Sequence, residues 1–115
     1  MYTSYYASKK LEPGMNLVGI SQSIPPFVKQ NINIYKPLAP SWGLVSEFKK
    51  CMITETQYER KYYATVLNRL NPEEVYQELG ADAVLLCWEA PGKFCHRHIV
   101  ARWLNKALNL NITEL

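Results

Sequence analysis

The sequence lacks several features that would assign the protein to a class at once. No apolar run is long enough to cross a membrane, and the first residues, MYTSYYASKKLEPG, contain no stretch of signal-peptide length. Glycine-rich phosphate loops of the form GxGxxG or GxxxxGK[ST] are also missing. We therefore expect a protein without a membrane partner and without the common nucleotide-binding loops.

Cysteine and net charge are both scarce. Three cysteines are an odd number with no small-scaffold spacing, which argues against a disulfide framework and favours a reducing, cytoplasmic compartment. The formal net charge is only +3, and the basic pairs are scattered among separate segments. Such a mildly basic chain permits an anionic small molecule or nucleotide as partner, whereas nucleic acid has only weak support.

What is present is the composition of one globular domain. The chain has 115 residues, of which 48% are hydrophobic and 20% charged. Apolar or β-prone stretches predict strands at residues 1–6, 16–21 and 82–88, an edge strand at 31–35 and a terminal strand at 111–115. We expect all of them to belong to a single domain over residues 1–115.

Helices are predicted in the middle of the chain and near its end. Helix start signals occur at Ser41, at Thr54 with Gln57, and at Asn71 with Pro72. The second helix carries Tyr58, Tyr62, Val66 and Leu70 at helical spacing, Gly80 closes the third, and a fourth begins near residue 95. This succession predicts an α/β fold, a mostly parallel sheet flanked by helices on its faces.

One strand–loop–helix unit holds most of the reactive side chains. In VLLCWEAPGKFCHRHIVARWL, residues 84–104, the strand ends at Cys87 and Cys95-His96-Arg97 opens the last helix. The carboxyl edge of an open α/β sheet is where ligands bind, and a helix N-terminus favours anions and thiolates. His96 shares the inward stripe of the helix with Val100, whereas His98 lies on the outer side.

These residues support a thiol enzyme as the leading hypothesis. Cys95 or Cys87 is the nucleophile and His96 the base. Glu89 assists with protons or orientation, and Arg97 with the helix end binds an anion. Ser21 and Ser23, which follow the second strand, are candidate neighbours of this ligand site. The sixth residue after Cys87 is a lysine and no arginine follows until Arg97, so the loop signature of phosphatases and rhodaneses is absent.

Three other interpretations of the same residues stay open. Cys87, Glu89, Cys95 and His96 supply a plausible metal ligand set, as in a zinc-stabilised module, although CxxC and HxxxH are missing. A pocket without catalysis needs only the helix end, Arg97 and the two serines. In the third, the unit is structural: the cysteines are buried packing residues and Glu89 pairs with Arg97 in a binding or adaptor domain.

The chain resembles a known family over nearly its whole length. LLCWE…PGKFCHRHIVARWL is similar to the C-terminal signature of the domain of unknown function 488 family. LAPSWGL and QYERKYYATVLNRL resemble its Ala-Pro-Ser segment and Tyr-rich helix, and YTSYYAS and LVGISQSIP the opening strands of a short bacterial and phage branch. The resemblance implies a compact α/β domain in a cytoplasmic bacterial or viral setting, without an agreed activity. The signature falls on Cys87, Glu89, Cys95, His96 and Arg97, and the Asp-Val-Arg motif of longer members is absent.

Overall fold

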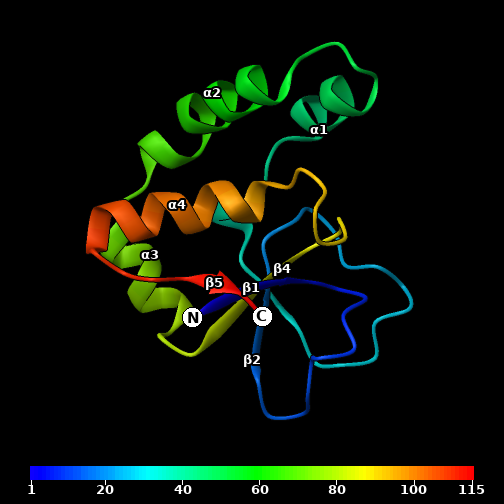
Figure 1. Ribbon diagram of the computed structural model, residues 1–115, viewed down its shortest axis with the longest axis vertical. Coiled ribbons are helices and arrows are strands. Elements are labelled where there is room, and N and C mark those ends of the chain that lie inside the picture. Colours follow the sequence, from blue (N-terminus) through cyan, green and yellow to red (C-terminus); the bar gives the residue numbers. More distant parts are fainter.

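Five parallel strands form one sheet in the order β3-β2-β4-β1-β5 (Figure 1). The computed structural model describes all residues, 1–115. The strands are β1 (Tyr2–Tyr5), β2 (Asn16–Gly19), β3 (Asn33–Ile34), β4 (Ala83–Cys87) and β5 (Thr113–Glu114). The predicted α/β class and parallel sheet are thus confirmed, and every predicted strand is present. β3 is shorter than predicted, in keeping with its place at the edge, where it pairs only with β2.

The first three helices begin directly after their predicted caps, and the fourth begins at residue 96, close to its predicted start. They are α1 (Trp42–Lys49), α2 (Glu55–Thr65), α3 (Pro72–Leu79) and α4 (His96–Leu108), with short 3-10 helices at Lys36–Leu38 and Leu67–Arg69. Ser41 accepts a hydrogen bond from the Leu44 amide, and Thr54 and Gln57 form the predicted capping box. None of these helices has the length and apolar character needed to cross a bilayer.

The second helix ends earlier than its apolar spacing predicts. The spacing of Tyr58, Tyr62, Val66 and Leu70 predicts a helix up to Leu70, but α2 stops at Thr65. The chain tightens into the 3-10 helix at Leu67–Arg69, which buries Leu67 in the core. A local periodicity cannot anticipate this change, because the burial of Leu67 depends on the distant segments that surround it.

All four helices contribute to the core on one face of the sheet, and α4 packs directly on β1 and β4. The main core joins Leu85 of β4 and Val18 of β2 to buried residues from every helix. The opposite face carries a smaller cluster, which contains Leu17 and Leu86 and no helix residue. Loops cover that face, because the connections at 6–15 and 20–32 contain no helix. The helices that the sequence predicts on the faces of the sheet therefore lie on one side of it, and the carboxyl ends of β2 and β4 open beside them.

Candidate functional site

A pocket of about 620 Å³ lies at the carboxyl ends of β2 and β4. Its walls come from α1, the segment between α1 and α2, the loop after β2, and the loop that joins β4 to α4. Six of the seven residues that the sequence selects line it: Ser21, Ser23, Cys87, Glu89, Cys95 and His96. Arg97 is the exception. The predicted convergence of the strand end, the helix start and the two serines thus describes one real cavity.

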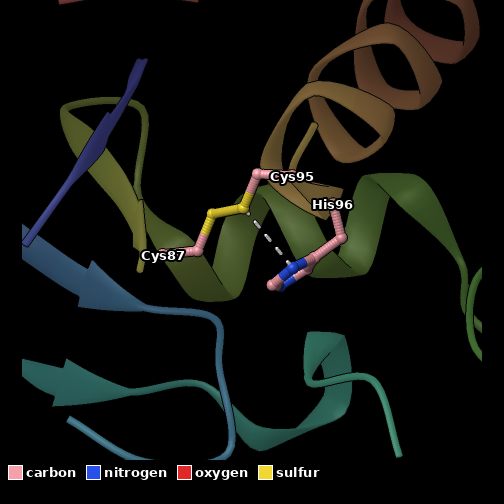
Figure 2. Close-up of side chains that lie close together, drawn as sticks. All are labelled: Cys87, Cys95 and His96. Carbon is pink, nitrogen blue, oxygen red and sulfur yellow. Dashed lines mark hydrogen bonds between the residues drawn. A yellow bond between two sulfur atoms is a disulfide. The ribbon is translucent and has the colours of Figure 1, made fainter. Parts of the chain in front are cut away.

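Cys87, Cys95 and His96 form a buried group at the pocket, which we call the cysteine–histidine centre (Figure 2). Cys87 ends β4, and the other two residues open α4. The two sulfur atoms form a disulfide, although the Cα atoms lie 7.2 Å apart. The sequence predicts free cysteines here, and that prediction is wrong because the fold brings the two sulfurs together. An odd cysteine count conceals the pair, because the third, Cys51, is free and exposed.

His96 is neutral, and its hydrogen bond fixes which ring nitrogen is free. Nε2 lies 2.6 Å from the carbonyl oxygen of Ile20. Because a carbonyl only accepts, Nε2 carries the hydrogen and Nδ1 keeps its lone pair. Nδ1 lies 3.8 Å from the Cys95 sulfur. Burial lowers the pKa of His96 to about 4, with a further contribution from the charge of Arg97. The predicted inward orientation is confirmed, and the imidazole offers a free base directed at the sulfur.

Arg97 is held inside the protein. Its side chain is fully buried, and its Nε and Nη2 atoms donate to the two carboxylate oxygens of Glu114 at 3.1 and 2.9 Å. Nη1 donates to the Glu89 carbonyl oxygen at 2.7 Å and lies 3.2 Å from the Cys87 sulfur. Arg97 was predicted to bind an anionic ligand, whereas all of these partners are protein atoms. The carboxylate that pairs with it belongs to Glu114, and Glu89 contributes only its backbone.

Glu114 has a lowered pKa because of this pairing. Partial burial raises the pKa of its carboxyl group, but hydrogen bonds from Arg97 and Thr3, together with the Arg97 charge, outweigh that effect. The folded protein therefore binds a proton at Glu114 less readily than the unfolded chain does. The group contributes stability that is fully present above its ordinary pKa of 4.5 and is lost as the pH falls through the lower, folded pKa.

We expect Glu114→Gln to remove this part of the acid sensitivity. The variant should be less stable than the wild type at neutral pH, and the difference should shrink as the pH falls below 4.5. Urea unfolding at a series of pH values measures the difference. Glu12→Gln, at an exposed position, is the control and should follow the wild type throughout. A Glu114→Gln difference that stayed constant down to the lowest pH would contradict this account.

Aromatic side chains form much of the pocket wall. Trp42 and Trp88 are 63% and 47% exposed, and both line the cavity. Trp88 is held in place, because its indole Nε1 donates to the Ser23 carbonyl oxygen at 3.0 Å. Deeper in the pocket, Phe94 packs against the rings of Phe48 and Tyr58. No local sequence signal separates an exposed ring from a buried one beside a turn, so the exposure of Trp88 could not be predicted.

Ser21 shapes the wall through its own hydrogen bonds. Its hydroxyl donates to the Ser23 carbonyl oxygen at 2.7 Å and bonds the Tyr6 hydroxyl at 2.6 Å. Tyr6 can reach this position because Gly19 has no side chain, and a Cβ there would lie 2.5 Å from the Tyr6 oxygen. The Ser21 hydroxyl is therefore engaged within the protein, and its observed role is to order the loop after β2.

The pocket is lined by equal numbers of positively and negatively charged side chains. Two cations, Lys49 and Lys93, and two carboxylates, Glu55 and Glu89, line it. The N-terminus of α4 also meets the pocket, and no side chain caps it. The two lysines are one favourable position for an anion. The first-turn amides of α4, together with the positive end of its helix dipole, are a second.

The fold and the site define a parallel α/β domain with a buried cysteine–histidine centre at the carboxyl edge of its sheet. Residues 3–108 match the model of the DUF488-N3a family, described as the active DUF488-N3 subclade. The protein therefore belongs to the DUF488 family, as its sequence signature predicts. Searches of curated proteins and of solved structures gave no match.

Proposed function

We propose that the protein is a small enzyme whose pocket binds a nucleotide-like ligand, an aromatic group joined to an anion. The observation that carries the proposal is the meeting of three features in one cavity: aromatic walls, rim cations and the cysteine–histidine centre. Pockets that combine apolar walls with a few convergent polar groups and a perturbed pKa are typical of active sites. The matched subclade is described as active, which agrees with a working site.

The pocket offers a separate position for each part of such a ligand. A flat base would stack against the exposed rings of Trp42 and Trp88, since aromatic platforms accept any base by its face. Its phosphate would lie near Lys49, Lys93 and the start of α4. Glu89 is available for donor groups of the base or sugar. In this arrangement the lysines replace Arg97, whose guanidinium is bound to Glu114.

The reacting bond of the ligand would face the cysteine–histidine centre. His96 can accept a proton at Nδ1, because burial keeps the ring neutral and Ile20 holds the other nitrogen. Cys95 can contribute only when the disulfide is reduced. A cytoplasmic setting, which is part of this proposal, would keep both cysteines as thiols. The oxidised protein would then bind the ligand without turning it over.

Calorimetric titration with the common ribonucleoside monophosphates tests the binding step. We expect saturable binding, and the double variant Lys49→Ala/Lys93→Ala should weaken it by about tenfold, equivalent to one good charge-assisted contact. Binding of the nucleoside without phosphate should change little. Lys106→Ala removes an exposed lysine near the far end of α4 and should leave both affinities unchanged.

Three outcomes would count against the proposal. If no mononucleotide binds to either the reduced or the oxidised protein, the pocket does not serve this class of ligand. If only oligonucleotides bind, and Lys49→Ala/Lys93→Ala has no more effect than Lys106→Ala, then recognition occurs elsewhere on the surface. If a nucleotide binds but the reduced wild type does not convert it, the chain is a binding domain and not this enzyme. If Cys95→Ser converts the ligand as fast as the wild type does, Cys95 does not take part in the reaction.

A further inference from the structure

The cysteine–histidine centre has the donor atoms of a metal site. One donor atom each from Cys87, Cys95 and His96 lies within 4.8 Å of the others, and all three residues are buried. We propose that the reduced protein binds one zinc ion through the two cysteine sulfurs and Nδ1 of His96. Thiolate and imidazole ligands together favour zinc over the hard cations magnesium and calcium.

The backbone spacing of the two cysteines agrees with a bridging ion. Their Cα atoms are 7.2 Å apart. Disulfides usually join Cα atoms about 4.4–6.8 Å apart. The ends of β4 and α4 therefore hold the cysteines slightly farther apart than a direct sulfur–sulfur bond prefers. Two sulfurs that share a tetrahedral ion are separated by the ion and need more room, which this spacing provides.

The surrounding hydrogen bonds match those that orient metal ligands. A histidine ligand usually donates its second ring N–H to a carbonyl or carboxylate, and His96 does so to Ile20 at 2.6 Å. Nδ1, the atom left free, is the one that faces the sulfur. Nη1 of Arg97 lies 3.2 Å from the Cys87 sulfur, so reduction of the disulfide would leave the Cys87 thiolate beside a cation. These partners would hold the ligands in place before an ion arrives.

The proposed site has only three protein ligands, and its fourth position faces the pocket. Glu89 lines the pocket but lies outside the three-residue group, so the four-residue ligand set of the sequence analysis reduces to three. Zinc sites with three protein ligands keep an open position for water or substrate, as catalytic sites do. The metal would thus deepen the proposed function by placing a polarising ion at the reacting end of the ligand. This catalytic role of the ion rests on the proposed function, whereas the binding of zinc does not.

The disulfide and the metal are alternative states of the same sulfurs. A dithiol reductant converts the disulfide to two thiols and is itself oxidised to a disulfide. Zinc then replaces the two thiol protons, which are released to solvent. Oxidation of the two thiolates by a small-molecule disulfide, which takes up two electrons and two protons and becomes two thiols, would re-form the protein disulfide and release the ion. Metal binding should therefore require reduction and should release protons.

Cobalt(II) titration of the reduced full-length chain, in the absence of oxygen, tests the site. We expect thiolate-to-cobalt charge-transfer absorption that saturates at one ion per chain and disappears when zinc is added. The oxidised protein should show none. His96→Gln should weaken binding by at least about tenfold, since even the loss of an outer-shell partner has effects of that size. Cys51→Ser removes the exposed cysteine and should leave the titration unchanged.

A second measurement on the wild type does not depend on the folding of any variant. Zinc should slow alkylation of Cys87 and Cys95 in the reduced protein and should not protect Cys51. The proposal is overturned if the reduced wild type gives no thiolate–cobalt band, if Cys51→Ser abolishes the band, or if zinc protects no cysteine. Nucleotide binding by the oxidised protein is measured separately, so failure of the metal site can be distinguished from failure of the ligand pocket.

Discussion

Replacing Arg97 with methionine should lower the free energy of unfolding by about 3 kcal/mol. Breaking a buried ion pair by removing one partner usually costs about 3–5 kcal/mol, because it leaves a charge without compensation. Glu114 keeps 28% side-chain exposure, so water can partly replace the lost guanidinium and the lower end of that range applies. Loss of the hydrogen bond to the partly buried Glu89 carbonyl adds to the effect. Urea unfolding at neutral pH measures it.

Arg102→Met is the matched control on the same helix. Arg102 also pairs with a glutamate, Glu59, but its side chain is 61% exposed. Exposed ion pairs contribute about 0–1 kcal/mol, so the control should lower the free energy of unfolding by less than about 1 kcal/mol. Arg97→Lys should fall between the two, because an ammonium group cannot form the paired contacts of a guanidinium. If Arg97→Met were no more harmful than Arg102→Met, Arg97 would not be the anchor described above.

Tyr62→Phe should lower the free energy of unfolding by about 1–3 kcal/mol. The Tyr62 hydroxyl donates to the Leu38 carbonyl oxygen at 2.6 Å, and both residues are fully buried. Removing the donor leaves that carbonyl without a partner inside the core, which has a penalty of this size. The Tyr62 ring also packs edge-on against His96, with ring centroids 5.6 Å apart. The substitution should therefore also change the mobility of His96, which lines the pocket.

Tyr58→Phe, one turn earlier in α2, provides the comparison. Tyr58 is also buried and stacks near Tyr62, but it lines the pocket and its hydroxyl forms no hydrogen bond within the chain. The free energy of unfolding should change by less than about 0.5 kcal/mol, as for substitutions that break no buried contact. Equal losses in the two variants would show that the Leu38 bond does not carry the effect.

Features governed by neighbours in the sequence could be predicted, and those governed by distant partners could not. The caps at Ser41, Thr54 and Asn71 are local, because each side chain bonds a backbone amide two or three residues away. The inward orientation of His96 follows from helical spacing alone. The predicted end of α2 was wrong, because the observed end depends on burial of Leu67 against residues far along the chain.

The candidate site shows the same division. Its location at the carboxyl edge follows from the order of strand, turn and helix, and six of the seven selected residues line the pocket. The partner of Arg97 could not be predicted, since Glu114 reaches it only through the pairing of β5 with β1. The disulfide likewise requires the three-dimensional distance between the end of β4 and the start of α4. Local pattern thus brought six of the selected residues to one pocket, and tertiary structure decided their contacts.

Binding of a ligand in the pocket beside the cysteine–histidine centre should be visible at the indole groups of the three tryptophans. Trp42 and Trp88 line the pocket, whereas Trp103 packs against the main core and does not. In 1H–15N NMR spectra, saturation with a bound mononucleotide should shift the indole signals of Trp42 and Trp88 and leave that of Trp103 in place. If the nucleotide moved only Trp103, or none of the three, the ligand would not occupy this pocket and the account would be contradicted.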